Sequence, residues 1–252
     1  MRSVLVTGAG RGVGLATARA LAAHGLRVFL GIRDRAKAGQ IATALRCSAG
    51  ETIPLGLDVT DKESISAAVA TIRAMGGLDI LINNAAVMPE SVDGGTRTIP
   101  PDDVTAEMLL NAFSTNFFGP VELIRQCLPM LRTGISPRIV NVSSRLGSFG
   151  LQTDPAWPHR QVNQLGYSSS KAALNMATVT LAYALRGTSI KVNAVTPGIV
   201  ATDLNGAGAN SLAGRPGYRT PEEGAALVIA CALLPDDGPT GQFFGPDGIA
   251  PW

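Results

Sequence analysis

The stretch TGAGRGVG, residues 7–14, follows a short apolar run and precedes a helix-length segment. A strand, glycine turn and helix in this order offer free backbone N–H groups and a positive helix end to a phosphate, and glycine allows close approach. The common dinucleotide pattern G-x-G-x-x-G is absent, because Val13 stands where its third glycine would be. The spacing is instead G-x-x-x-G-x-G, with Gly8, Gly12 and Gly14. It predicts a phosphate-binding turn, with a plain tight turn as the alternative.

Strand-length apolar runs alternate with helix-length segments along the rest of the chain. Nearly uninterrupted apolar runs are typical of parallel strands that helices cover on both faces. The alternation therefore predicts an α/β fold, a Rossmann-type doubly wound parallel sheet of about seven strands with helices on both faces. Since no composition shift marks a boundary, residues 1–252 are expected to form a single domain. The expected strands are 4–7, 27–31, 53–57, 79–82, 138–142, 190–195 and 242–244, and the expected helices are 13–24, 36–47, 61–74, 105–132, 165–186 and 221–233.

Two loops are longer than ordinary connections, residues 87–103 and 198–220. Both follow strands at the edge where the carboxyl ends of parallel strands, and hence ligands, gather. Long loops in compact domains are usually lids or binding loops. We expect the second, which is rich in glycine, to close over a bound ligand.

Composition excludes several classes of protein. With 46% hydrophobic and 16% charged residues the chain can bury a large core, which excludes a disordered polymer. A net charge of +2 without a long basic run gives no indication of a nucleic-acid or anionic-membrane partner. The longest apolar stretch, 225–234, is shorter than the roughly 20 residues of a membrane span. The apolar run before the glycine turn is too short for a signal-peptide core, so none is expected there.

The cysteines indicate a cytoplasmic location. Cys47, Cys127 and Cys231 are widely spaced, which fits neither a disulfide framework nor a metal site and does fit a reducing compartment. Each is expected to be a small hydrophobic core residue. No metal is expected.

Basic residues near the second strand favour NADP over NAD. NAD-specific sites place an acidic residue at the end of this strand to bind the ribose 2′-OH. Here Ile32 and then Arg33 follow, while Arg11 lies inside the glycine turn. Two guanidinium groups can bind a 2′-phosphate through charge-assisted hydrogen bonds. The alternative is that both are solvated surface arginines.

The stretch YSSSK, residues 167–171, predicts acid–base chemistry. Tyr167 and Lys171 are four residues apart and share a helix face. A nearby ammonium stabilises a phenolate, so we expect Lys171 to lower the pKa of Tyr167 and adapt it to general acid–base catalysis. The upstream stretch IVNVSS places the hydroxyls of Ser143 and Ser144 at the same edge of the sheet.

Taken in order, TGAGRGVG, LDVTD, NNAA, NFFG, IVNVSS, YSSSK and PGIVATDL resemble the short-chain dehydrogenase/reductase family. The resemblance implies that Ser144 binds the substrate carbonyl oxygen and that Tyr167 donates the proton. Lys171 would lower the pKa of Tyr167 and hold the nicotinamide ribose, and Asn116 would order a water relay to Lys171.

The resemblance also assigns cofactor contacts. Asp58 and Val59 would contact the adenine, residues 84–86 the middle of the cofactor, and residues 197–202 the nicotinamide carboxamide. Ala86 replaces a glycine usual in the family, which is tolerated if its φ is negative. The expected cofactor-binding residues are Gly8, Arg11, Gly12, Val13, Gly14, Arg33, Asp58, Val59, Asn84, Ala85, Ala86, Tyr167, Lys171, Pro197, Gly198, Val200 and Thr202.

Ser144 and Tyr167 are 23 residues apart (167 − 144), farther than is usual in the family. The extra segment, about 146–164, resembles in position the insertion of the monomeric NADPH-dependent carbonyl reductases. The NFFG segment, Arg33-Asp34 and the terminal Pro-Trp also resemble the corresponding parts of those reductases. An insertion packed on the helices near 105–132 and 165–186 would shield a face that tetrameric relatives pair, so we expect a monomer or weak dimer. The apolar residues expected to line the substrate pocket are Met88, Leu146, Phe149, Trp157, Val200 and Leu204.

These features predict NADPH-dependent reduction of a ketone, aldehyde or quinone to an alcohol by hydride transfer. The alternatives are a 3-oxoacyl or polyketide thioester reductase and a non-enzymatic, redox-sensing NADP-binding module. A serine hydrolase is disfavoured, because there is no G-x-S-x-G and only His24 and His159 could act as base. We expect both histidines to have surface roles. They and the dispersed cysteines offer no metal cluster.

Overall fold

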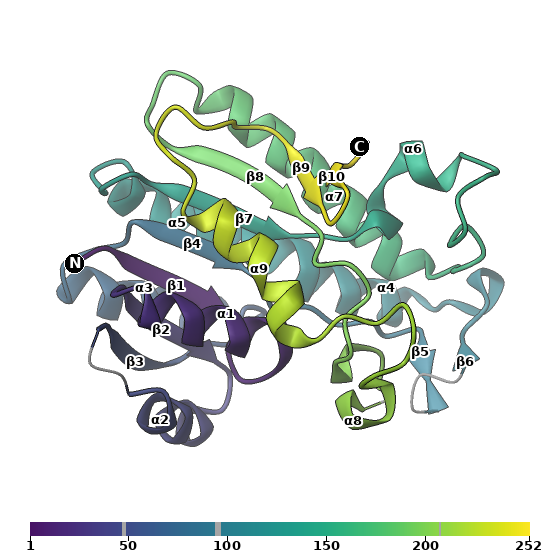
Figure 1. Ribbon diagram of the computed structural model, residues 1–252, viewed down its shortest axis with the longest axis horizontal. Coiled ribbons are helices and arrows are strands. Elements are labelled where there is room, and N and C mark those ends of the chain that lie inside the picture. Colours follow the sequence, from purple (N-terminus) through teal and green to yellow (C-terminus); the bar gives the residue numbers. More distant parts are fainter. Residues whose placement is uncertain (47–48, 94–96, 207) are drawn as a thin grey trace.

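The computed structural model describes residues 1–46, 49–93, 97–206 and 208–252. Within these residues an eight-stranded sheet has the order β10-β9-β8-β7-β4-β1-β2-β3 (Figure 1). All neighbouring pairs are parallel except β9 and β10. The strands are β1 (Ser3–Thr7), β2 (Arg27–Ile32), β3 (Glu51–Gly56), β4 (Ile80–Asn83), β7 (Arg138–Val142), β8 (Lys191–Val195), β9 (Phe243–Gly245) and β10 (Gly248–Ile249).

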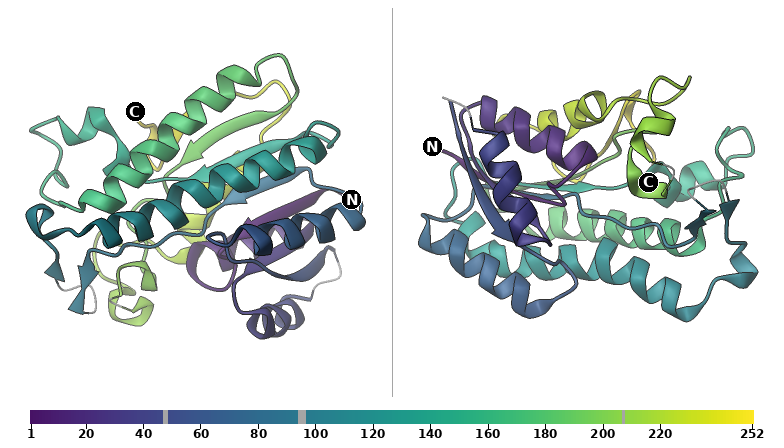
Figure 2. Two further views of the ribbon diagram at one scale, coloured as in Figure 1. Left: turned by 180° about the vertical axis from the view of Figure 1, so that it is seen from behind. Right: turned by 90° about the horizontal axis from the view of Figure 1, so that it is seen from below.

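Helices cover both faces of the sheet, as the alternating pattern predicts (Figure 2). One hydrophobic core joins the sheet to α1, α2 and α9, and a second joins its other face to α3, α5 and α7. The predicted doubly wound α/β fold is thereby confirmed. Cys231 lies in the first core and Cys127 in the second, as expected, whereas Cys47 lies outside the described residues. The helices are α1 (Gly12–Ala23), α2 (Arg35–Ala44), α3 (Lys62–Ala74), α4 (Ala106–Phe113), α5 (Gly119–Leu131), α7 (Leu165–Ala184) and α9 (Pro221–Ala232).

The predicted helix 105–132 is interrupted. A π-helical turn, Ser114–Phe118, separates α4 from α5 and contains Asn116. Such turns insert a residue into the α-helical hydrogen-bond pattern and are frequent at functional sites. Hydrophobic periodicity does not predict one, because the apolar face continues across it. The predicted helix 36–47 ends earlier, at Ala44, and its residue 47 lies outside the described residues.

Both long loops contain short elements that the sequence pattern did not predict. The first holds a hairpin, β5 (Ser91–Val92) and β6 (Arg97–Thr98), and a 3₁₀ turn, Pro101–Asp103. The second holds a 3₁₀ turn, Asp203–Asn205, and α8 (Ala209–Leu212). The insertion contains the 3₁₀ turn Arg145–Gly147 and α6 (Phe149–Gln152). All are too short for a periodic pattern to register. Residues 94–96 and 207 of the loops lie outside the described residues.

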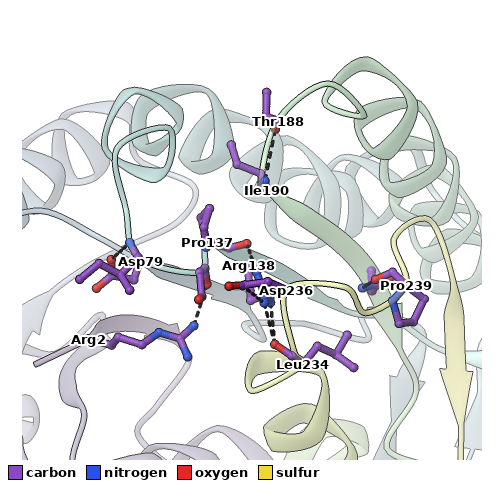
Figure 3. Close-up of polar contacts among 12 residues, drawn as sticks. Arg2, Asp79, Pro137, Arg138, Thr188, Ile190, Leu234, Asp236 and Pro239 are labelled. Atoms are coloured by element: carbon purple, nitrogen blue, oxygen red, sulfur yellow. Dashed lines mark hydrogen bonds and ion pairs between the residues drawn. The ribbon is translucent and has the colours of Figure 1, made fainter.

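A buried arginine fastens the amino end of β7, at the edge opposite the strand carboxyl ends (Figure 3). The Arg138 side chain is 1% exposed. Its Nε and Nη2 donate to the Leu234 carbonyl at 3.1 and 2.6 Å, and its Nη1 donates to the Pro137 carbonyl at 2.9 Å. Nη2 also contacts Asp236 at 2.8 Å. These bonds tie β7 to the segment that follows α9.

Replacing this arginine should destabilise the fold. Arg138→Met leaves the Leu234 carbonyl without its charged donor and should lower the free energy of unfolding by about 2–3 kcal/mol, within the range for hydrogen bonds to charged groups. Urea denaturation measures it. Arg125→Met is the control, because Arg125 is exposed and pairs with Glu122 on its own helix. Equal midpoints for both variants would contradict the structural role of Arg138.

Candidate active site

A cavity of about 540 Å³ opens at the carboxyl ends of the central strands. Every residue expected to bind the cofactor lines it, from the glycine turn through 58–59 and 84–86 to 197–202. Ser144, Tyr167 and Lys171 line the same cavity. Parallel strands place their carboxyl ends at one edge, which is why motifs far apart in the sequence meet here.

The glycine turn needs its glycines. Gly12 has a φ of +54°, in the left-handed region that favours glycine. A Cβ on Gly14 would lie 2.4 Å from both the Gly8 carbonyl oxygen and the Asn84 side-chain nitrogen. The first turn of α1 contains no acidic residue, and the Arg11 side chain does not cap the helix. The turn therefore presents a positive helix end that no described side chain caps, which suits an anion. Phosphate binding by the turn stays a prediction.

A basic edge borders one end of the cavity, beside the carboxyl end of β2. Arg33 and Arg11 line it, and Ile32, 6% exposed, occupies the strand end where an NAD site would carry an acidic residue. The nearby carboxylate of Asp34 accepts from the backbone N–H of Ala36 at 2.9 Å and so caps α2. The Asp34 carboxylate is therefore bonded to the first turn of α2.

Lys37 also belongs to this edge and was not predicted from the sequence. It lines the cavity, and its Cε lies 3.8 Å from where a Cβ on Gly10 would stand. A lysine in the first turn of the helix after Arg33 was the available signal. Asp203 was missed as well: it lines the cavity, and its carboxylate lies 3.5 Å from the Arg11 guanidinium in the glycine turn. Closure of the 198–220 loop stays a prediction.

The NNAA motif joins the ends of β1 and β4. The Thr7 hydroxyl accepts from the backbone N–H of Asn84 at 2.9 Å and of Ala85 at 3.0 Å. The Asn84 side chain donates to the Thr7 carbonyl at 2.8 Å. Ala86 is not among the residues with positive φ, so alanine is tolerated there, as expected.

The proposed acid–base group is compact. The side chain of Ser144 interacts with the Tyr167 hydroxyl and acts to lower the pKa of the phenol. The Lys171 ammonium donates to the Val142 carbonyl at 2.9 Å and lies 5.7 Å from the centre of the Tyr167 ring. The end of β7 and the first turns of α7 thus bring hydroxyl, phenol and amine together.

Asn175 supports this arrangement and was not predicted. Its side chain accepts from the Ser143 hydroxyl at 2.5 Å and donates to the Gly147 carbonyl at 3.1 Å. It therefore ties the end of β7 and the turn after Ser144 to α7. Its place on the helix, one turn after Lys171, was the available signal.

Asn116 is fully buried beside this group and does not line the cavity. Its side chain accepts from the Val87 N–H at 2.9 Å and donates to the Val87 carbonyl at 2.9 Å and to the Ser170 hydroxyl at 3.0 Å. Its direct contact with α7 is thus Ser170. The water relay from Asn116 to Lys171 stays a prediction.

Burial governs the ionisation of this group. It raises the pKa of Tyr167 to about 12, an effect that the interaction with Ser144 partly opposes. It also lowers the pKa of Lys171 to about 7. The expected lowering of the Tyr167 pKa by the lysine is therefore wrong here, because desolvation of the two buried side chains is the larger effect. A phenol with a high pKa keeps its proton at neutral pH, the form that can donate it.

Only some of the residues expected to line the substrate pocket lie at the cavity. Val200 and Leu204 line the cavity, whereas Met88, Leu146 and Trp157 do not. Phe149 is 72% exposed and forms no buried wall. The ring of Trp157 packs edge-on against His159 at 5.7 Å, within the insertion.

In the described part of the chain, no helix is long and apolar enough to cross a membrane. The described His, Cys, Asp and Glu side chains form no group of three or more that could hold a metal ion. His24 ends α1, where its Nδ1 contacts the Ala20 carbonyl oxygen at 2.8 Å on the exposed surface, consistent with a capping histidine.

A family model described as short chain dehydrogenase matches residues 2–211. The chain belongs to this family of oxidoreductases. Retinol dehydrogenase 14 of Mus musculus is 35% identical over 268 residues, 97% of this chain and 77% of that protein.

Two solved structures extend the comparison. An NADPH-bound carbonyl reductase from chicken fatty liver has a TM-score of 0.79 and 29% identity, covering 100% of this chain and 99% of its own. Salutaridine reductase from Papaver somniferum has a TM-score of 0.77 and 29% identity, and the match covers 98% of this chain and 100% of the salutaridine reductase chain. This short-chain dehydrogenase therefore shares its fold with reductases over almost its whole length.

The buried lysine should make stability depend on pH. Because the folded-state pKa of Lys171 is about 7 against an ordinary 10.5, the unfolded chain binds more protons between these values, and the free energy of unfolding rises with pH across that window. Lys171→Met removes this contribution. Without cofactor, the variant should gain stability relative to wild type at low pH, and this gain should shrink as pH rises through the window.

Thermal melting across that pH range measures the effect. Lys62→Met, at an exposed position in α3, is the matched control and should follow the wild-type curve. If the melting temperatures of wild type and Lys171→Met change with pH in parallel, burial does not destabilise the Lys171 ammonium.

Proposed function

We propose that this short-chain dehydrogenase is a carbonyl reductase-like, NADP-dependent enzyme that reduces a ketone, aldehyde or quinone to an alcohol. The observation that best supports the proposal is that Ser144, Tyr167 and Lys171 line the same cavity as the glycine turn. In this proposal residues 1–252 form one NADP-binding domain of a cytoplasmic enzyme. The carbonyl substrate is a small molecule.

The residues present fit NADP. The glycine turn can hold a pyrophosphate, and Arg33, Arg11 and Lys37 lie at the basic edge where an adenosine 2′-phosphate would bind. Ile32 offers no carboxylate to a ribose 2′-OH. The NADPH-bound carbonyl reductase from chicken, which has a closely similar fold, supports this choice.

The side chains divide the chemistry among them. NADPH, when bound, supplies the hydride to the carbonyl carbon. The Ser144 hydroxyl donates a hydrogen bond to the substrate oxygen, and the Tyr167 phenol gives that oxygen its proton. Ser144 and the nearby Lys171 then stabilise the phenolate that remains at Tyr167. In the proposal Lys171 also holds the nicotinamide ribose.

Two other functions use the same fold. A 3-oxoacyl or polyketide thioester reductase would share the acid–base group and differ in its substrate. A redox-sensing NADP-binding module would bind NADPH without turnover. The contact of Ser144 with Tyr167 at the cavity wall favours an enzyme over the module. A panel of diones, quinones and thioesters assayed by NADPH consumption separates the three.

A monomer or weak dimer remains our proposal for the assembly, on the resemblance to monomeric carbonyl reductases. The argument from shielding does not apply to much of the face formed by α4, α5 and α7, which lie side by side on the back of the molecule (Figure 2). Several apolar side chains there remain exposed. They are Leu110, Phe118, Val121, Met176, Val179 and Tyr183.

Removing the phenolic hydroxyl tests the proton donor. Tyr167→Phe keeps the buried ring and should leave the dissociation constant of NADPH nearly unchanged, while kcat falls by about 10²-fold or more. Tyr183→Phe, at an exposed tyrosine of the same helix, is the control. Turnover by Tyr167→Phe close to that of wild type would rule out the mechanism.

The basic edge can be tested through cofactor preference. Arg33→Ala should weaken NADPH binding by about 10- to 100-fold, since charged hydrogen bonds to the 2′-phosphate are lost, and should change NADH binding little. Arg35→Ala is the control, because Arg35 is exposed and does not line the cavity. Equal losses for both cofactors would mean that Arg33 does not contact the 2′-phosphate.

A further inference from the structure

A carboxyl group is buried against the helix that holds the proposed proton donor. Glu90 follows β4 in the first long loop and is 0% exposed. Its Oε1 accepts hydrogen bonds from the backbone N–H groups of Gly166 and Tyr167, the latter at 3.1 Å. Among the described residues, its Oε2 has no hydrogen-bond partner. A fully buried acidic side chain is rare without a specific role.

The start of α7 depends on this residue. Gln164 stands at the N-cap, and its side chain makes no capping hydrogen bond. The first N–H groups of a helix need acceptors, and a carboxylate there also interacts favourably with the helix dipole. Glu90, from 76 residues upstream, supplies the missing cap. Glycine at 166 permits it, because a Cβ there would lie 2.8 Å from the Glu90 oxygen.

The same loop also reaches Tyr167 from its carbonyl side. The Ser170 hydroxyl donates to the Tyr167 carbonyl at 2.7 Å and accepts from Asn116. Asn116 is in turn paired with the backbone of Val87, three residues before Glu90. Both backbone groups of Tyr167 are therefore linked to residues 87–90, directly on one side and through two side chains on the other.

We propose that Glu90 is a positioning residue, whose carboxylate against the first turn of α7 fixes where the Tyr167 phenol lies and opposes its ionisation. The inference rests on the proposed function for its kinetic readout, because it concerns the donor in that reaction. Glu90 does not line the cavity and does not touch the substrate or cofactor site.

The charge of Glu90 should raise the pKa of Tyr167. A negative charge at the backbone of Tyr167 disfavours the phenolate of that residue, so removing it should lower the pKa of Tyr167. Among described residues, Lys171 is the other ionisable side chain facing Tyr167, and it stays in place. On the neighbouring elements, the groups nearest to Tyr167 are uncharged. They are Ser144 at the end of β7, Asn116 in the π-helical turn, and Leu109 and Ala112 of α4, which pack near Gly166. Reduction needs the protonated phenol, so the alkaline decline of kcat should move to lower pH.

Two substitutions separate position from charge. Glu90→Ala removes the cap and should lower kcat by about 10- to 100-fold, the scale of loss when a reacting group is misplaced, with NADPH affinity nearly unchanged. Glu90→Gln keeps an acceptor oxygen, so it should recover most of kcat while its alkaline decline moves down by about half a pH unit or more. Glu107→Gln, an exposed acid in the first turn of α4, should change neither quantity.

Tyrosinate absorbance gives a second readout that needs no turnover. The difference between each protein and its Tyr167→Phe counterpart reports the ionisation of Tyr167 alone, and in Glu90→Gln it should shift to lower pH. An unshifted titration, or Glu90→Ala with wild-type kcat, would overturn the proposal. If Glu90→Ala does not fold, Glu90→Gln decides. If the wild type reduces no carbonyl, the proposed function fails, while the titration still tests Glu90.

Discussion

The turn that follows Ser144 lies directly against the backbone of α7, and the proposed site depends on this contact. A Cβ on Gly147 would stand 2.6 Å from the carbonyl carbon of Lys171, so only glycine allows the approach. Ser143 and Asn175 fasten the same junction through their side chains. The junction brings Ser144 to Tyr167 although 23 residues separate them in the sequence (167 − 144). The insertion can thus lengthen the connection without separating the two hydroxyls.

Close packing at this junction has an electrostatic consequence. Tyr167 and Lys171 are 5% and 2% exposed, so each loses most of the hydration that would stabilise its charged form. The phenol is thereby kept protonated and the lysine becomes a weaker base. A charged lysine beside an exposed tyrosine would have the opposite effect on the phenol. The depth of the junction, more than the spacing of the two residues, decides their ionisation.

The segment that follows β4 connects the two halves of the site. Its first residues, Asn84 and Ala85, are bonded to the end of β1 beside the glycine turn. Glu90 contacts α7 directly, and Val87 is linked to α7 through Asn116. One short stretch of chain therefore borders the cavity at one end and contacts the helix of the proposed proton donor at the other.

The sequence by itself determined the doubly wound parallel sheet and the glycine turn, because these follow from local periodicity, glycine spacing and the parallel-strand rule. The other residues expected to bind the cofactor were assigned by the resemblance to the family, and they line the cavity. Tertiary structure decided what depends on distant partners: the π-helical turn at Asn116, the basic edge completed by Lys37, and the cap that Glu90 gives to α7. It also reversed the predicted pKa of Tyr167, and it left Phe149 exposed outside the cavity. Burial and long-range hydrogen bonds arise only when segments far apart in the chain meet, and a pattern confined to neighbouring residues holds no information about them.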